Sequence, residues 1–208
     1  MEDFCSYVGQ AIDLFRYDPR SPMLFSSGLF LFVFLGFSLI YGLLKRRLTL
    51  RIVYVTLFSL YFYYKTSGLF FLLLVGLSLS DFAIGRLMHH SRRSEARKSL
   101  LVLSLLINLG LLCYFKYADL IVSAVAGLID RTLTLPDIFL PVGISFFTFQ
   151  SMSYVIDLYR RQIEPVRRWI DYLFYLSFFP QLVAGPIVRA RDFLPQIYRN
   201  PVFVSRDM

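Results

Sequence analysis

The sequence predicts an all-α, polytopic transmembrane bundle with about six membrane segments, some of them broken or re-entrant. Three observations support this fold class. Of the 208 residues, 57% are hydrophobic and 17% are charged, and the mean hydropathy is +0.59. This is too apolar for a soluble domain with a polar shell. Apolar stretches recur along the chain, and basic residues gather in alternate connections between them. The predicted solvent of the chain is therefore a lipid bilayer.

Six uncharged stretches supply the predicted membrane segments: residues 23–44, 52–64, 66–80, 99–115, 138–156 and 172–188. A helix that spans the hydrocarbon core needs roughly 20 residues. The first stretch reaches this length alone. The others reach it if flanking Lys and Arg stems extend to the interface, or if the helices are short and held within a bundle. The second and third stretches meet at KTSG, which predicts a tight hairpin on the outer side.

Shorter features complete the predicted organisation. Residues 4–15 suit either an interfacial helix or a loose terminus, and residues 118–130 suit an interfacial helix on the outer surface. Asp81 is expected to reach Arg86 or to lie near the interface. Cys5 and Cys113 are far apart in the predicted topology and have no metal-ligand company, so both are interpreted as packing residues.

The net charge of +8 is unevenly distributed. Thirteen basic residues follow the first, third and fifth segments, and the alternate connections before residue 188 contain five. The positive-inside rule therefore places the basic loops in the cytoplasm and the N-terminus outside the cell membrane. The charge is topological and does not indicate nucleic-acid binding. The alternative for a basic loop is a contact with an acidic carrier or a nucleotide-bearing donor.

Two stretches contain residues that disturb a membrane helix. Pro141 and Gly143 precede the segment that contains Gln150, and SFFPQLVAGPIVR at 177–189 contains two prolines and a glycine. Proline removes a helical hydrogen bond and crowds the preceding turn. A lipid-facing segment cannot leave the freed carbonyl groups bare. Residues 177–189 are therefore expected to face protein or a hydrated cavity, with kinks at Pro180, Gly185 and Pro186.

Polar residues near the membrane midplane are the candidate site residues. Asn108, Gln150 and Gln181 are predicted to line one cavity, and the alternative for each is a hydrogen bond that fastens two helices together. Lys116 and Arg189 are either ligands of the same cavity or charged anchors at the interface. We identify no catalytic residue and no metal site among the patterns of the sequence.

Several ordered motifs resemble the membrane-bound O-acyltransferase family, in its bacterial alginate O-acetyltransferase and D-alanyl-transfer branch. They are LPVGISFFTFQSMSYVIDLYRRQIEPVR from residue 140, DYLFYLSFFPQLVAGPIVRARDFLPQI from residue 171, NLGLLCYFKYADL at 108–120 and MLFSSGLFLFVFL from Met23. The resemblance covers nearly all of the chain after residue 22.

The resemblance implies a ring of helices around a funnel through which an acyl group passes. The donor would be a cytoplasmic thioester, acetyl-CoA or an acyl carrier protein. The acceptor would be a hydroxyl of an exported polysaccharide or cell-envelope polymer, met together with an extracytoplasmic acetylation partner. Within this scheme Gln150, Gln181 and Arg189 are expected on the cavity or acceptor side, with Asn108 and Lys116 behind them.

The resemblance departs from this chain at the catalytic histidine, which in the family lies on a later helix. The sequence contains two histidines, His89 and His90, and both are expected in a solvated cytoplasmic loop. The chain is therefore interpreted as residues 1–22, an extension or interfacial helix, followed by 23–208, the N-terminal part of an acyltransferase domain. We expect a fragment, a truncated reading frame or one piece of a split protein, starting at Met1 or Met23 and inactive alone. The alternative function is a non-catalytic, transporter-like or partner-binding membrane protein.

Overall fold

The computed structural model describes residues 17–18, 25, 27–44, 47–129, 140–186 and 188–198. Within these ranges the chain is helical and contains no strand. The longer helices are α2 (Gly28–Leu43), α3 (Leu48–Ser67), α4 (Phe71–His90), α5 (Ser94–Ile129) and α6 (Ile144–Tyr159). Three short helices follow, α7 (Trp169–Ser177), α8 (Phe179–Ala184) and α9 (Ala190–Ile197), and a 3-10 turn, η1 (Gly68–Phe70), joins α3 to α4. The predicted all-α class is confirmed for these residues.

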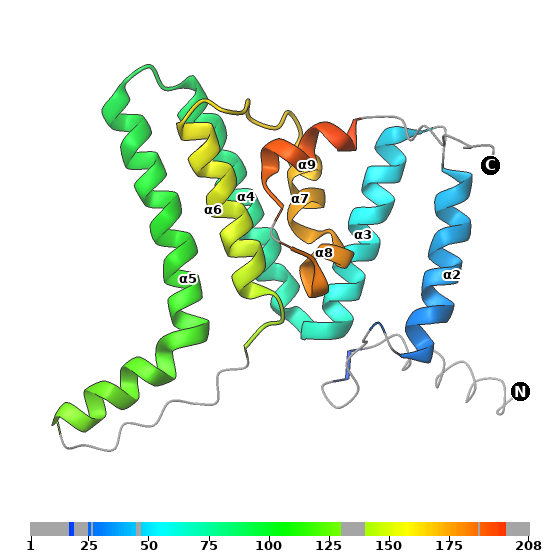
Figure 1. Ribbon diagram of the computed structural model, residues 1–208, viewed down its shortest axis with the longest axis horizontal. Helices are drawn as coiled ribbons and strands as arrows, with labels where there is room; N and C mark the ends of the chain where they lie inside the picture. The colour runs from blue at the N-terminus through cyan, green and yellow to red at the C-terminus, as the bar shows by residue number, and fades with distance from the viewer. Residues whose placement is uncertain are drawn as a thin grey trace, which may run out of the picture.

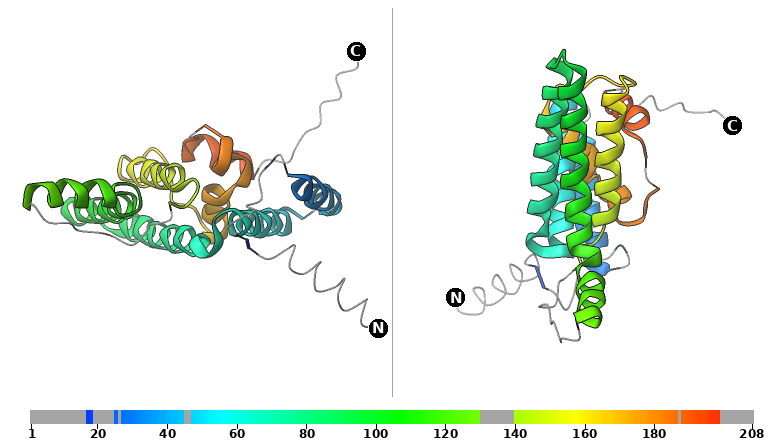
Figure 2. Two further views of the ribbon diagram at one scale, coloured as in Figure 1. Left: turned by 90° about the horizontal axis from the view of Figure 1, so that it is seen from below. Right: turned by 90° about the vertical axis from the view of Figure 1, so that its left-hand side faces the viewer.

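The helices form two layers. Helices α2 to α5 stand in a row, and α6 and the short helices α7 to α9 lie on one side of it (Figures 1 and 2). Helix α6 packs against α4 and α5, whereas α7 packs against α3 and α4. Helix α2 lies at the end of the row against α3. The short helices are therefore held against the centre of the row.

Two stretches, Leu48–His90 and Ser94–Ala118, are long and apolar enough to cross a membrane. The first contains both α3 and α4, because the chain reverses at Gly68, which has a φ of 62°. This reversal is the predicted KTSG hairpin. Helix α2 is apolar but shorter, with 16 residues. By length and composition these helices agree with the predicted membrane protein, and the number of six segments stays a prediction.

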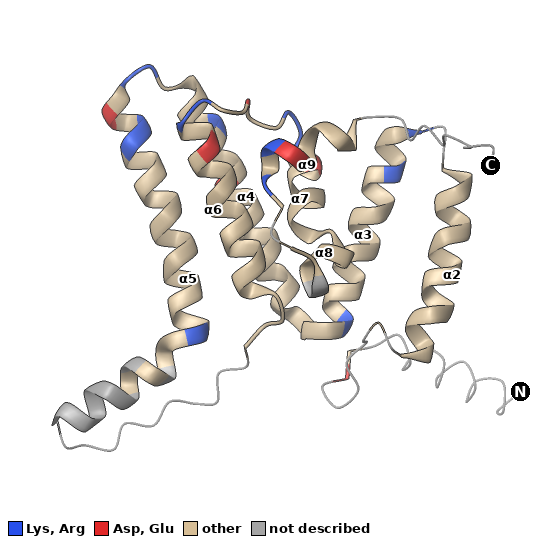
Figure 3. Ribbon diagram, viewed as in Figure 1, with Lys and Arg blue, Asp and Glu red and all other residues tan. Residues whose placement is uncertain are grey.

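Lys and Arg residues are concentrated at one end of the bundle, which we call the basic end (Figure 3). Helices α3, α5 and α7 begin at this end, and α4 and α6 finish there. The predicted clustering of the basic connections is therefore present in the fold. The identity of this end as cytoplasmic stays a prediction.

Helix α5 differs from the predicted pair of helices. Residues 118–129 continue α5 instead of forming a separate element, although its last turns bend away from the bundle (Figure 1). The stretch 99–129 contains no proline, and its glycines lie within good helix formers, so nothing stops the helix before Ile129. Residues 118–129 are therefore helical but not a separate element as predicted, and their interfacial position stays a prediction.

The core between the layers is rich in aromatic side chains. Tyr154, Tyr172 and Tyr175 are fully buried where α6 and α7 meet α4 and α9. A second aromatic group surrounds Phe179 of α8, which lies 5.1 Å from Phe58 of α3 between ring centroids. Packing of this kind fixes the short helices α7 and α8 in place.

Candidate functional site

Residues 169–189 form a re-entrant segment. Helix α7 starts at the basic end and runs inward, α8 follows, and the chain then returns to the basic end at α9 (Figure 1). The two ends of the segment meet, because the Tyr198 hydroxyl after α9 donates a 2.6 Å hydrogen bond to Asp171 in the first turn of α7. The predicted broken segment therefore turns back.

The predicted kinks are complete breaks. Helix α7 ends before Phe178, whose φ of −53° and ψ of 105° are not helical, and Pro180 then lies in the first turn of α8. At that position proline costs no helical hydrogen bond, because the first amides of a helix have no partner within it. Gly185 ends α8 in an extended conformation, and Pro186 follows. The expected crowding of the preceding turn by either proline is therefore avoided.

Side chains satisfy the irregular backbone of the re-entrant segment. Ser59 of α3 accepts a hydrogen bond from the Phe179 amide at 3.3 Å. The Gln181 side-chain amide donates to the Pro186 carbonyl at 3.2 Å, and the Tyr175 hydroxyl donates to the Val188 carbonyl at 2.9 Å. Such bonds are what allow non-helical backbone at membrane depth.

The start of α6 cradles α8. Gly143 caps α6 with a left-handed φ of 76°, and a β-carbon there would lie 2.8 Å from the Leu182 carbonyl oxygen. Pro141 precedes this turn, and α6 starts at Ile144. The predicted disturbance at the beginning of this helix is thus a tight approach between α6 and α8.

A buried polar cluster joins α4, α5, α6 and α7, and we call it the Asp81 cluster. The Asp81 carboxylate accepts hydrogen bonds from the hydroxyls of Ser104 and Ser151 and, at 2.8 Å, from the Asn108 amide. The Tyr172 hydroxyl lies 2.8 Å from Ser151. Because the single hydroxyl proton of Ser151 goes to Asp81, Tyr172 is the donor of that bond.

Asp81 was not among the predicted site residues, and the expectation for it was wrong. It is fully buried and bonds to α5 and α6, whereas Arg86 lies with its guanidinium 5.7 Å from the Phe82 ring. The cluster has a sequence signal, because Ser104 and Asn108 are four residues apart and share one face of an apolar helix. Two polar side chains on one face of an apolar helix need hydrogen-bond partners, so this face indicates a polar residue on a neighbouring helix.

A cavity of about 740 Å³ opens at the basic end beside the re-entrant segment. We call it the Asp171 pocket. Its walls are the connection 162–168, the first turn of α7 and helix α9, and three arginines line it, Arg167, Arg168 and Arg191. Ion pairs join Arg168 to Asp171 at 3.1 Å and Arg191 to Asp192 at 3.6 Å.

Asp171 is the buried group of this pocket. Its side chain is fully buried, and Oδ2 accepts the bonds from Arg168 and Tyr198, whereas Oδ1 has no hydrogen-bond partner. Burial, followed by the bond to Asp171 and the charge of Asp171, raises the pKa of Tyr198 to about 12. The pocket therefore has exposed cations at its wall and a buried carboxylate behind them.

The predicted site residues have different neighbours in the structure. Asn108 belongs to the Asp81 cluster, Gln181 bonds to Pro186, and Lys116 is exposed, with its ammonium 5.5 Å from the Tyr117 ring. Arg189 is exposed at the cap of α9. Gln150 is 1% exposed, and its amide nitrogen has no partner. Among the described residues no hydrogen bond joins any two of these five, and their common cavity stays a prediction.

His89 and His90 lie in the last turn of α4 rather than in a loop, and both are exposed at the basic end, as expected. Cys113 is a free thiol that is exposed on α5, so its interpretation as a packing residue was wrong. Cys5 and nearly all of the predicted domain 1–22 lie outside the described residues. No group of three or more His, Cys, Asp or Glu side chains suitable for a metal ion occurs in the described ranges.

The chain is similar in sequence to proteins named as O-acetylating enzymes. It is 34% identical over 180 residues to the probable alginate O-acetylase AlgI of Pseudomonas aeruginosa, across 84% of this chain and 34% of that protein. It is 32% identical to the protein of the same name from Azotobacter vinelandii, across 84% of this chain and 36% of that protein. It is 29% identical over 203 residues to the peptidoglycan O-acetyltransferase of Helicobacter pylori, across 84% of this chain and 38% of that protein.

This chain spans about a third of the length of the curated relatives that it matches. No family model and no solved structure matches it.

Proposed function

Because this chain belongs to the same family as these alginate and peptidoglycan O-acetyltransferases, we propose that it forms part of a membrane O-acetyltransferase. The acetyl group moves from a thioester donor at the basic end to a hydroxyl of an exported polysaccharide or cell-envelope polymer. The basic end faces the cytoplasm, and the first residues of the chain lie outside the cell membrane. The donor is acetyl-CoA or an acyl carrier protein.

The observation that carries this proposal is the re-entrant segment. Irregular backbone at membrane depth is tolerated where it is enclosed by protein or lines a hydrated passage. Here it lies against α3, α4 and α6, side chains hydrogen-bond to three groups of its irregular backbone, and it ends beside the Asp171 pocket. The buried, unpartnered amide nitrogen of Gln150 and carbonyl oxygen of Asn108 support the same assignment, because such groups in native proteins normally bind water or a ligand.

In the proposed reaction the acceptor hydroxyl oxygen forms an ester bond with the acetyl carbon. The carbon–sulfur bond of the thioester breaks, and the hydroxyl proton leaves through a general base while the thiolate is protonated. His89 and His90 are exposed at the basic end and do not line the Asp171 pocket, so we assign the base to neither. This chain supplies the wall and the donor-side pocket, and a second part of the enzyme supplies the base.

The test is acetyl transfer with and without a complementing polypeptide. The chain is produced alone, and together with the part of the Pseudomonas aeruginosa relative outside the matched region, in membranes supplied with radiolabelled acetyl-CoA. Alginate and peptidoglycan are offered as acceptors. We expect label in a polymer only when both polypeptides are present. Label transferred by the chain alone would contradict the assignment of the general base to a second part of the enzyme. Absence of label in every combination would contradict the proposed acetyl transfer.

A transporter-like protein is the second candidate, and the same re-entrant segment favours it, because broken helices also form transport sites. Uptake of acetylated or unacetylated saccharides into vesicles that contain the chain, without any acetyl donor, distinguishes the two. We expect no uptake above that of empty vesicles.

A further inference from the structure

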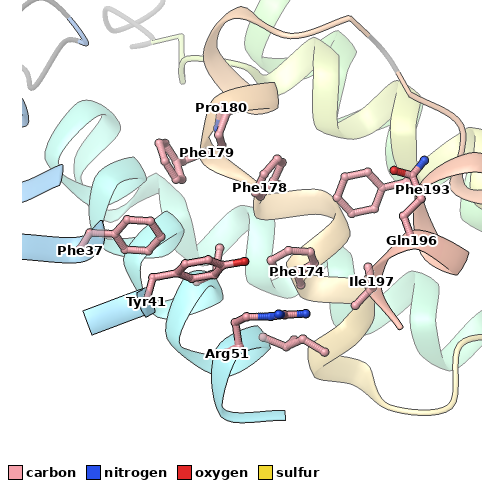
Figure 4. A pocket seen from close by; sticks show the side chains of 12 residues that line it. Phe37, Tyr41, Arg51, Phe174, Phe178, Phe179, Pro180, Phe193, Gln196 and Ile197 are labelled. Carbon is pink, nitrogen blue, oxygen red and sulfur yellow. The ribbon is translucent and has the colours of Figure 1, made fainter. Parts of the chain in front are cut away.

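A second cavity, of about 390 Å³, lies on the other side of the re-entrant segment, between α2 and α3 on one side and α7 to α9 on the other (Figure 4). We call it the aromatic pocket. Five phenylalanine rings line it: Phe37 of α2, Phe174 of α7, Phe178 between α7 and α8, Phe179 of α8 and Phe193 of α9. It shares no residue with the Asp171 pocket.

The positive charge of the aromatic pocket, on Arg51, is at one end. Arg51 and Pro180 lie at opposite ends of the group of side chains in Figure 4. Arg51 belongs to the first turns of α3, at the basic end, whereas Pro180 belongs to α8 within the bundle. The pocket therefore runs from the basic end toward the middle of the bundle and changes from cationic to apolar along its length.

Arg51 is half-buried, and its guanidinium lies 5.9 Å from the centroid of the Tyr41 ring. Among the described residues no Asp or Glu forms an ion pair with Arg51. A guanidinium at the edge of a hydrocarbon-like space is expensive to leave without an anion. The charge of Arg51 is therefore available to a ligand.

The pocket opens toward the surroundings of the bundle, because Pro180 and Gln196 in its wall are exposed. In a membrane protein lipid fills such an opening wherever no other polypeptide packs against it. A ligand that matches the pocket has an anionic group for Arg51 and an extended apolar part for the phenylalanine rings. Anionic phospholipids have both, and basic pockets between membrane helices are known to bind their headgroups.

We propose that the aromatic pocket binds one anionic phospholipid, with its phosphate at Arg51 and one acyl chain along the phenylalanine rings toward Pro180. The bound lipid fills the space between α2 and the re-entrant segment and fixes α2 at the end of the row. The inference rests on the placement of the chain in a membrane and is independent of acetyl transfer.

The test is photocrosslinking in lipid nanodiscs. The full chain is reconstituted in phosphatidylcholine with a small fraction of photoreactive phosphatidylglycerol, or of photoreactive phosphatidylcholine as the zwitterionic comparison. Crosslinked peptides are identified by mass spectrometry. We expect phosphatidylglycerol to label peptides of α3, α7 and α9 around the pocket about fivefold more than phosphatidylcholine, the factor that one arginine near an anionic surface typically gives.

Variants separate charge from shape. Arg51→Gln removes the preference for phosphatidylglycerol, and Arg51→Lys keeps most of it. Arg47→Gln is the matched control, because Arg47 is exposed at the start of the same helix and does not line the pocket. Gln196→Trp covers the opening from an exposed position and lowers labelling by both lipids. Helix content by circular dichroism confirms that each variant is folded.

Two outcomes would overturn the assignment. Equal labelling of the pocket by the two lipids would show that its apolar surface contacts lipid without recognising the headgroup. A phosphatidylglycerol preference that survives Arg51→Gln shows that the anion binds elsewhere on the basic end. An inactive enzyme in the transfer assay has no bearing on either result, so this inference and the proposed function fail separately.

Discussion

Asp81 fastens three other helices to α4 through a single carboxylate. Its oxygens accept bonds from α5 and α6 directly, and from α7 through the Tyr172 and Ser151 hydroxyls. A buried carboxylate without a cation is stable only when several donors surround it. Apolar side chains can pack in several alignments of one helix along another. A buried hydrogen-bonded cluster favours the one alignment in which its groups meet.

Replacing Asp81 should therefore destabilise the bundle, and the loss should be larger when the new side chain has fewer oxygens to accept hydrogen bonds. Asp81→Leu leaves three buried donors without an acceptor and should cost more than about 3 kcal/mol of unfolding free energy, whereas Asp81→Asn keeps one oxygen and should cost about 1 kcal/mol. Denaturant titration in detergent, followed by circular dichroism, measures both. Asp192→Leu is the control, because its side chain is exposed. A stable Asp81→Leu variant would show that the cluster is incidental.

Tyr198 has a role that depends on pH. It lies after α9 at the basic end, and its pKa is raised from 10.0 to about 12 by burial and by Asp171. The folded state thus favours the neutral phenol. The stabilisation is fully present below about pH 10, the ordinary tyrosine value, and is lost as the pH rises through the folded-state pKa.

Tyr198→Phe should lower the melting temperature at neutral pH, with a loss of about 1 kcal/mol for one hydrogen bond. The difference from the unchanged chain should shrink steadily across the alkaline range, because the phenolate that forms there is repelled by Asp171. Melting curves at a series of pH values measure this difference. Tyr114→Phe, at an exposed position of α5, should show no such trend. A constant difference at every pH would rule out the linkage.

At the scale of elements, the re-entrant segment shows what the sequence can predict. Pro180, Gly185 and Pro186 correctly indicate that the helix breaks and that polar groups must enclose it. The direction of the chain after each break depends on partners far away in sequence, Ser59 on α3 and Gly143 before α6. A uniform apolar stretch carries no signal for those contacts.

The same limit explains the site residues. Asn108, Gln150 and Gln181 were predicted from depth in the membrane, and depth does not determine which way a side chain points around its helix. Asn108 and Gln181 bond to different neighbours, and these neighbours, Asp81 and the Pro186 carbonyl, fix their orientation. Asp171 was not among the predicted site residues, because it precedes the uncharged stretch 172–188, yet the turn back of α9 buries it beneath Tyr198.

Gly143→Ala tests the contact between α6 and α8. The left-handed φ of 76° costs alanine about 1–2 kcal/mol. The new β-carbon also lies 2.8 Å from a backbone oxygen of α8. We expect a lower melting temperature and faster proteolysis within residues 177–189. Gly110→Ala is the matched control, since nothing lies within 4 Å of its β-carbon, and there the better helix propensity of alanine should leave stability equal or higher. Equal melting temperatures and proteolysis rates of the two variants would contradict a tight contact between Gly143 and α8.

At the scale of the whole molecule, the fold predicts that both ends of the re-entrant segment face the same side of the membrane. This can be read from cysteines introduced into a chain whose native Cys5 and Cys113 are replaced by serine. Ser91→Cys, Glu164→Cys and Arg191→Cys should react together with an impermeant maleimide from one side of sealed vesicles, because all three lie at the basic end. Lys116→Cys should react from the other side, since α5 starts at the basic end and carries residue 116 toward its far end. If Arg191→Cys is instead labelled from the same side of the vesicles as Lys116→Cys, residues 169–189 cross the membrane. The Asp171 pocket then does not form, and the donor-side assignment is wrong. If the first three react only from outside, the fold stands and the positive-inside orientation is reversed.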